Sequence, residues 1–162
     1  MERKDLNEPC FPRALPRPED RSKYPVRLRS FYPSTKQALN RAVDDVLQMA
    51  GLCGCIDDDQ MDLEIALREA LANAITHGNS SRTAKRVFLR CYGSPGSDIL
   101  VLVRDEGKGF DPEQVPDPRN ADRRLLHHGR GLLLMRKLMD HVTYRKAGRE
   151  VLIYKTVGRQ RG

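Results

Sequence analysis

The segment 68–79, REALANAITHGN, carries Glu69, Asn73 and His77 at four-residue intervals among Ala, Leu and Ile. Residues four apart lie on the same side of a helix, so these polar side chains would form one line. An amide oxygen such as that of Asn73 can bind Mg²⁺ while the ion also holds substrate phosphates. A carboxylate one turn away, that of Glu69, has the chemistry of a general base. Ordinary solvated helix faces show the same spacing, so this line alone leaves both interpretations open.

A second segment with possible chemistry is DEGKGFDP, residues 105–112, which follows the apolar run 98–104. Asp105 would stand at the end of a buried strand, where its carboxylate can accept a hydrogen bond from an exocyclic amine such as N6 of adenine. Gly107 and Gly109 would let the backbone approach a flat ring. Asp and Gly are also the usual residues of a plain turn, which is the alternative interpretation.

The third segment is HGRGLLLM, residues 128–135, in which Gly129 and Gly131 precede an apolar run. Unpaired N–H groups at a helix start, together with the helix dipole, form an anion site. Arg130, His127 and His128 would add cationic contacts to a phosphate. A simple glycine cap is the alternative, and the two histidines have too few companions for a zinc site.

Composition favours one cytoplasmic domain. The chain has 162 residues, 39% of them hydrophobic, and a net charge of +7. It contains no apolar stretch of about 18 residues, and its charged N-terminus lacks the apolar core of a signal peptide. Aromatic residues make up 6% and Trp is absent, so the basic residues lack the interleaved rings that stack nucleic-acid bases. The charge therefore favours a solvated surface or a polyphosphate nucleotide over direct nucleic-acid binding.

The four cysteines, Cys10, Cys53, Cys55 and Cys91, match neither a paired zinc pattern nor a secreted disulfide framework. We interpret them as reduced, mostly structural thiols. Cys53 and Cys55 in GLCGC could also be redox-active or weak metal ligands, although no second ligand cluster accompanies them.

The hydrophobic pattern predicts the elements that must position these segments. Residues 1–24 contain four prolines among charges and predict a flexible tail, followed by one domain over 25–158 and a short tail over 159–162. A strand is expected over 26–31, and then a helix from a Ser34–Gln37 capping box to Gly51. The other expected elements are a helix over 58–77, strands over 85–93 and 98–104, a loop over 111–128, a helix over 129–140 and a hairpin over 141–157 turning at Ala147–Gly148.

This order is β-α-α-β-β-loop-α-β-β. Short turns rather than helical crossovers join consecutive strands, so the sheet should be mixed and mainly antiparallel with the helices on one face. The expected fold class is a two-layer α/β sandwich with the strand 98–104 at its centre. A long proline-containing loop inside a compact domain, here 111–128, is usually functional.

Taken together and in this order, EALANAITHGN, DEGKGFDP and GRGLLLMRKLMD resemble the N, G1 and G2 boxes of the GHKL (Bergerat-fold) ATPases. The chain is similar in particular to the anti-sigma-factor serine/threonine kinases of bacterial partner-switching systems. The resemblance covers residues 26 to 157. One difference is LHHGRG, which stands where relatives often have a small polar residue before the first glycine.

The resemblance implies a site for ATP and Mg²⁺ whose residues follow from the matching boxes. It makes Asn73 the magnesium ligand and Glu69 the acid that activates the attacking hydroxyl. It makes Asp105 the adenine reader, with Gly107 and Gly109 beside it. It makes Gly129 and Gly131, with Arg130 between them, the glycines that close on the phosphates, and it makes His77 the residue that ends the N box. The segment 111–128 becomes the nucleotide lid, in which Arg123 and Arg124 could also contact the γ-phosphate.

The expected function is that of a serine/threonine kinase which phosphorylates a small antagonist protein and binds a sigma factor, as a homodimer. One alternative is an ATP-binding adaptor that sequesters a partner without phosphate transfer. A second alternative is the ATP-binding domain of a two-component histidine kinase, for which the 24-residue tail is expected to be too short.

Overall fold

The computed structural model describes residues 22–54, 60–111 and 127–156. These residues form a single five-stranded sheet and the helices that pack on it. The elements in chain order are β1 (Val26–Pro33), α1 (Lys36–Cys53), α2 (Gln60–Ala72), the π-helical segment η2 (Asn73–Gly78), β2 (Arg86–Ser94), β3 (Asp98–Arg104), α3 (His127–Leu138), β4 (His141–Arg145) and β5 (Glu150–Thr156). The strand order is β1-β2-β3-β5-β4. Every neighbouring pair is antiparallel, so the described sheet has no parallel pair where a mixed, mainly antiparallel sheet was predicted. The predicted sandwich class and the predicted order of elements along the chain are confirmed.

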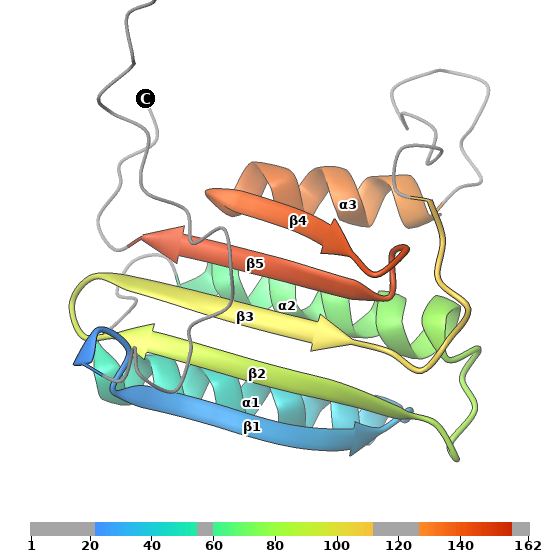
Figure 1. Ribbon diagram of the computed structural model, residues 1–162, viewed down its shortest axis with the longest axis horizontal. Coiled ribbons are helices and arrows are strands. Elements are labelled where there is room, and N and C mark those ends of the chain that lie inside the picture. The colour runs from blue at the N-terminus through green and yellow to red at the C-terminus, as the bar shows by residue number, and fades with distance from the viewer. Residues whose placement is uncertain (1–21, 55–59, 112–126, 157–162) are drawn as a thin grey trace, which may run out of the picture.

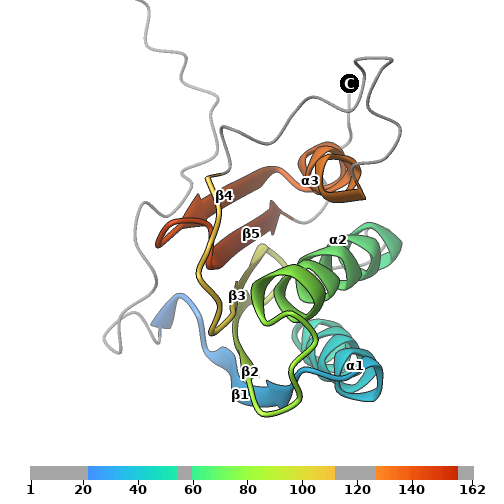
Figure 2. The same cartoon turned by 90° about the vertical axis from the view of Figure 1, so that its right-hand side faces the viewer.

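The helices α1, α2 and α3 lie on one side of the sheet, as the two perpendicular views show (Figures 1 and 2). The core lies between these layers. Leu63, Leu67 and Leu71 recur on one face of α2 and are at most 1% exposed, as are Val101 and Val103 of β3. Because β3 has a strand on each side and apolar residues on both faces, it is the central strand, as predicted.

Helix α1 begins and ends at other residues than those predicted. Its N-cap is Thr35, whose hydroxyl accepts the Ala38 N–H at 3.1 Å. Ser34 does not cap the helix, because its hydroxyl donates to the carbonyl oxygen of Lys85 at 2.9 Å and the residue is 3% exposed. The helix runs through Gly51 to Cys53 and is capped by Gly54, whose φ of 60° is left-handed. A glycine can stay within a helix, so the sequence alone did not show which of the two ends it.

The packed part of the chain begins before the predicted boundary at residue 25. Tyr24 is 2% exposed and packs edge-on against Tyr92 with ring centroids 6.3 Å apart. Its hydroxyl donates to Asp98 at 3.3 Å, so this residue belongs to the domain rather than to the tail. Residues 1–21 and 157–162 lie outside the described residues.

Helix α3 also starts earlier than predicted. It begins at His127, so His127 and His128 belong to a helix rather than to a loop, and Gly129 lies in its first turn. The low helix propensity of glycine moved the predicted boundary by two residues. The remainder of the predicted lid, 112–126 with Arg123 and Arg124, lies outside the described residues.

Cys91 is a buried thiol in β2, and burial raises its pKa well above the usual range. A thiol that stays protonated in the core is unreactive, which agrees with the structural role predicted for it. Cys10 and Cys55 lie outside the described residues. In the part of the chain that the structure describes, no helix combines the length and apolar character needed to cross a membrane.

Candidate nucleotide site

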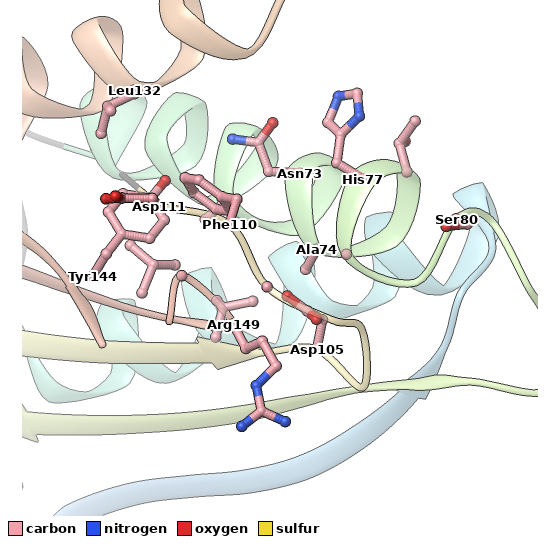
Figure 3. A pocket seen from close by; sticks show the side chains of 17 residues that line it. Asn73, Ala74, His77, Ser80, Asp105, Phe110, Asp111, Leu132, Tyr144 and Arg149 are labelled. Carbon is pink, nitrogen blue, oxygen red and sulfur yellow. The ribbon is translucent and has the colours of Figure 1, made fainter. Parts of the chain in front are cut away.

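Most of the predicted site residues line two adjoining cavities at one end of the sheet, although Gly107 lines neither of them. The larger, about 610 Å³, is lined by η2, the loop that follows β3, helix α3 and the β4–β5 turn (Figure 3). Asn73, His77 and Asp105 line it. The smaller, about 340 Å³, is lined by Glu69 and Gly131 and again by Asn73 and His77. Asn73 and His77 therefore stand between the two spaces.

The polar line of the opening segment crosses a change of helix type. Helix α2 is α-helical to Ala72, and Asn73–Gly78 then forms a π-helical turn. The N–H of Asn79 donates to the carbonyl oxygen of Ala74, five residues earlier, at 2.8 Å. Such wider turns often mark functional sites. Glu69 thus lies on the regular helix, whereas Asn73 and His77 lie on the widened turn, which the sequence did not predict.

Asp105 is held at the end of β3 beside the larger cavity. Its backbone N–H donates to the carbonyl oxygen of Arg149 at 3.0 Å. Its side-chain Oδ1 accepts the N–H of Gly107 at 2.7 Å. Burial raises the pKa of this carboxyl, against the lowering effects of the Gly107 N–H and the charges of Arg149 and Lys85. A partly desolvated acceptor at a cavity wall is suited to a hydrogen-bond donor from a ligand.

Glycines allow the loop after β3 to lie directly on η2. A Cβ atom at Gly78 would overlap the Asp105 carboxylate, and one at Gly107 would overlap the Gly78 carbonyl. Gly109 has a φ of 84° and lies against the Ala147 carbonyl. Gly107 and Gly109 were predicted to let the backbone approach a ligand ring. In the structure they let the backbone approach other parts of the chain, Gly78 and Ala147.

Helix α3 approaches α2 closely at Gly131. A Cβ atom there would overlap the Glu69 carboxylate and would lie 3.6 Å from Nδ2 of Asn73. Arg130, the preceding residue, is exposed and lines the smaller cavity. Gly129 lies in the first turn of the same helix. The glycine at 131 is therefore what lets α3 come against the carboxylate of α2.

The match to known families agrees with this geometry. The model of the histidine kinase-like ATPase domain matches residues 32–155, which include all residues that line both cavities, strands β2, β3 and β4, and all of β5 but its last residue. The chain belongs to the histidine kinase-like ATPase domain family. An ATPase domain implies that ATP is bound.

Curated relatives of this ATPase domain are named serine-protein kinase RsbW. The protein from Staphylococcus epidermidis is 30% identical over 115 residues, which is 66% of this chain and 72% of the relative. That from Bacillus subtilis is 34% identical over 100 residues, 58% of this chain and 62% of the relative.

A solved structure shares the fold of the ATPase domain. It contains the RsbU and RsbW domains of a Mycobacterium tuberculosis protein and aligns with a TM-score of 0.56 at 14% identity. The alignment covers 81% of this chain and 32% of that one.

Several residues that line the ATPase site were not predicted. Phe110 and Tyr144 line the larger cavity with ring centroids 5.2 Å apart, edge to face. Burial raises the pKa of Tyr144 to about 12, so its hydroxyl stays protonated at neutral pH. Asn79 is fully buried next to the site. Phe110 could have been noticed because it follows the glycines of the second box, but Tyr144 lies in a strand with no motif.

The donor set of the ATPase site fits magnesium. The described residues contain no group of three or more His, Cys, Asp or Glu side chains that could hold a metal by themselves. Mg²⁺ takes oxygen ligands and usually needs only one or two from the protein, because water and substrate phosphates supply the others. The amide oxygen of Asn73, which lines both cavities, can supply such a ligand.

Proposed function

We propose that this protein is an ATP-dependent serine/threonine kinase and anti-sigma-type regulator, which phosphorylates a small antagonist protein. The observation that carries the proposal is the position of Glu69, which lines the smaller cavity next to Asn73, a residue shared by both cavities. A general base would thus stand beside the place where the terminal phosphate of a nucleotide leaves the larger cavity. The names of the curated relatives support the same activity.

The nucleotide would lie with its base in the larger cavity. Asp105 would accept a hydrogen bond from the adenine amine, and backbone N–H groups in the first turn of α3, near Gly129, would bind phosphate oxygens. The side chain of Arg130 lines the smaller cavity and would pair with the γ-phosphate. Asn73 would hold Mg²⁺, which when bound supplies positive charge to the phosphate oxygens.

The chemical step would be an in-line phosphoryl transfer. The acceptor Ser or Thr hydroxyl gives its proton to Glu69 as its oxygen bonds to the γ-phosphorus. The bond from that phosphorus to the β–γ bridging oxygen breaks, and ADP leaves. Most of the rate in such reactions comes from positioning and electrostatic stabilisation, which the site residues provide.

The partners follow from the kinase branch that the three boxes resemble. The unphosphorylated antagonist would displace a sigma factor from this protein, and phosphorylation would release the antagonist. The protein would act as a homodimer. Light scattering at micromolar concentration tests that last point, because a monomer of 18.5 kDa with and without nucleotide would contradict it.

The direct test is to incubate the purified protein with Mg-ATP and the antagonist-like proteins of its own genome. The expected product is one of these proteins carrying phosphoserine or phosphothreonine. If a partner binds in the presence of ATP but no phosphate is transferred, the protein is an ATP-binding adaptor instead.

A further inference from the structure

Asn79 is a fully buried residue whose side chain links the end of η2 to three other segments, one of which is the loop after β3 that lines the larger cavity. It follows η2 and has an exposed fraction of 0%. Its Nδ2 group donates to the hydroxyl of Ser34 at 2.8 Å and to the carbonyl oxygen of Arg86 at 3.0 Å. Its Oδ1 atom accepts the backbone N–H of Glu106 at 2.8 Å. A buried amide that is satisfied at both ends restricts the positions of all its partners.

The bond to Glu106 bears directly on Asp105. The Glu106 N–H belongs to the peptide group that joins it to Asp105, so this hydrogen bond fixes the orientation of the peptide plane after Asp105. The peptide plane before Asp105 is held by its own N–H, which donates to the carbonyl oxygen of Arg149. The carboxylate is then oriented by the Gly107 N–H. Asn79 thus supplies one of the hydrogen bonds that set the direction of the Asp105 side chain.

We propose that Asn79 is a positioning residue for base recognition, which aligns the Asp105 carboxylate with the exocyclic amine of the nucleotide. This inference rests on the proposed role of Asp105 in reading adenine. It predicts that Asn79 determines the preference for a 6-amino base over a 6-oxo base. A hydrogen bond to a charged acceptor depends steeply on its angle, so a small rotation of the carboxylate is enough to weaken that preference.

Ser34 provides the matched control, because it belongs to the same network but lies on its other side. Ser34→Ala removes one acceptor of the Asn79 Nδ2 group, while the carbonyl of Arg86 remains. The bond between Oδ1 and Glu106 is untouched. If Asn79 only stabilised the fold, Asn79→Ala and Ser34→Ala would affect binding of the two base types equally.

The experiment measures the dissociation constants of ATP and inosine triphosphate for the wild type, Asn79→Ala, Ser34→Ala and Asp105→Asn, at a temperature where each is folded. Wild type should prefer ATP. Asn79→Ala should reduce that preference by roughly tenfold, the size of one misaligned charged hydrogen bond. Ser34→Ala should keep the wild-type preference, and Asp105→Asn should abolish it.

The outcomes separate the inference from the proposed function. If wild type and Asp105→Asn bind both nucleotides alike, Asp105 does not read the base and the site assignment fails. If Asp105→Asn loses the preference but Asn79→Ala keeps it, Asn79 is only structural. Should Asn79→Ala not fold, amide hydrogen exchange of the wild type decides. The Glu106 N–H should then be protected although its side chain is exposed, and fast exchange there would overturn the inference.

Discussion

The two ends of the nucleotide site are built by different means. At the base end, the Asp105 carboxylate accepts the Gly107 N–H, and the Asp105 N–H donates to the carbonyl oxygen of Arg149, the residue before β5. Asn79 holds the next peptide group, and glycines let the backbone segments lie in contact. At the phosphate end, Glu69 and Gly131 come from two helices that pack against each other. The first arrangement fixes one carboxylate within a hydrogen-bonded network, whereas the second depends on the distance between α2 and α3.

This difference separates recognition from chemistry. Substitutions at the base end should change which nucleotide binds, because they alter Asp105, the hydrogen-bond acceptor that we propose contacts the base. Substitutions at the phosphate end should change the rate of transfer, because they displace groups that act on the acceptor hydroxyl.

Replacement of the proposed base should have the largest effect. Glu69→Gln should lower the phosphotransfer rate by a factor on the order of 10² to 10⁴, the usual contribution of a general base, with ATP affinity nearly unchanged. The control is Glu64→Gln on the same helix, which loses only a half-exposed ion pair with Arg68. Single-turnover rates with a proven protein substrate measure both. A Glu69→Gln rate equal to wild type would mean that another group takes the proton.

Separation of the two helices should have the next largest effect. Gly131→Ala places a methyl group where the Glu69 carboxylate lies, so α3 must move or the carboxylate must turn away. We expect transfer to slow by roughly ten- to a hundredfold, as misplacement of catalytic groups by about 1 Å does. Gly51→Ala is the control, because that helical glycine has no neighbour within 4 Å of an added Cβ. It should raise stability by about 0.5–1 kcal/mol with no change in rate. If both variants transfer phosphate at the wild-type rate, the close approach at 131 has no catalytic role.

The base end should show opposite effects on binding and stability. Asp105→Asn keeps an oxygen for the Gly107 N–H but loses the charge, so ATP affinity should fall about tenfold. Burial raises the Asp105 pKa, so the folded protein holds this proton more tightly than the unfolded chain does. The wild-type free energy of unfolding therefore decreases as the pH rises from the ordinary value of 3.8 through the raised pKa.

Asp105→Asn replaces the carboxyl with a neutral amide that does not titrate in this range. The free energy of unfolding of the variant therefore does not decrease in this way as the pH rises. Asp105→Asn should therefore have a higher melting temperature than wild type at neutral pH, and the difference should shrink as the pH is lowered through this range. Calorimetric melting at several pH values measures the effect. A variant that is less stable than wild type at neutral pH would show that the charges of Arg149 and Lys85 outweigh burial.

The smallest effect is expected at the β4–β5 turn that supports the base end. Ala147 has a φ of 53°, and its carbonyl oxygen accepts the Phe110 N–H at 2.9 Å. Ala147→Gly should raise stability by up to about 1 kcal/mol, because glycine adopts a positive φ without strain. ATP affinity should not change. Ala84→Gly, at an exposed position without positive φ, should instead be neutral or slightly destabilising. Equal effects of the two substitutions would mean that position 147 is not strained.

The sequence predicted the order of helices and strands along the chain and the turn at 147–148, because hydrophobic period and turn residues are local properties. It predicted less well where elements begin and end. Ser34 looked like a cap, yet its hydroxyl bonds to Lys85, a partner 51 residues away. The π-helical turn at Asn73 had no local signal either, since the residues in it also suit an ordinary helix.

The sequence by itself determined the chemical groups of the site. Its three motifs supply the carboxylates, the amide and the glycines, and local pattern alone assigned them to a helix, a strand end and a helix start. Only the tertiary structure decided which of them meet. That Gly131 lies on Glu69, that Gly78 lies on Asp105 and that Asn79 bonds to Glu106 follow from packing of segments 27 or more residues apart. Such contacts depend on the distance between layers and on the absence of a Cβ atom, neither of which a local sequence pattern records.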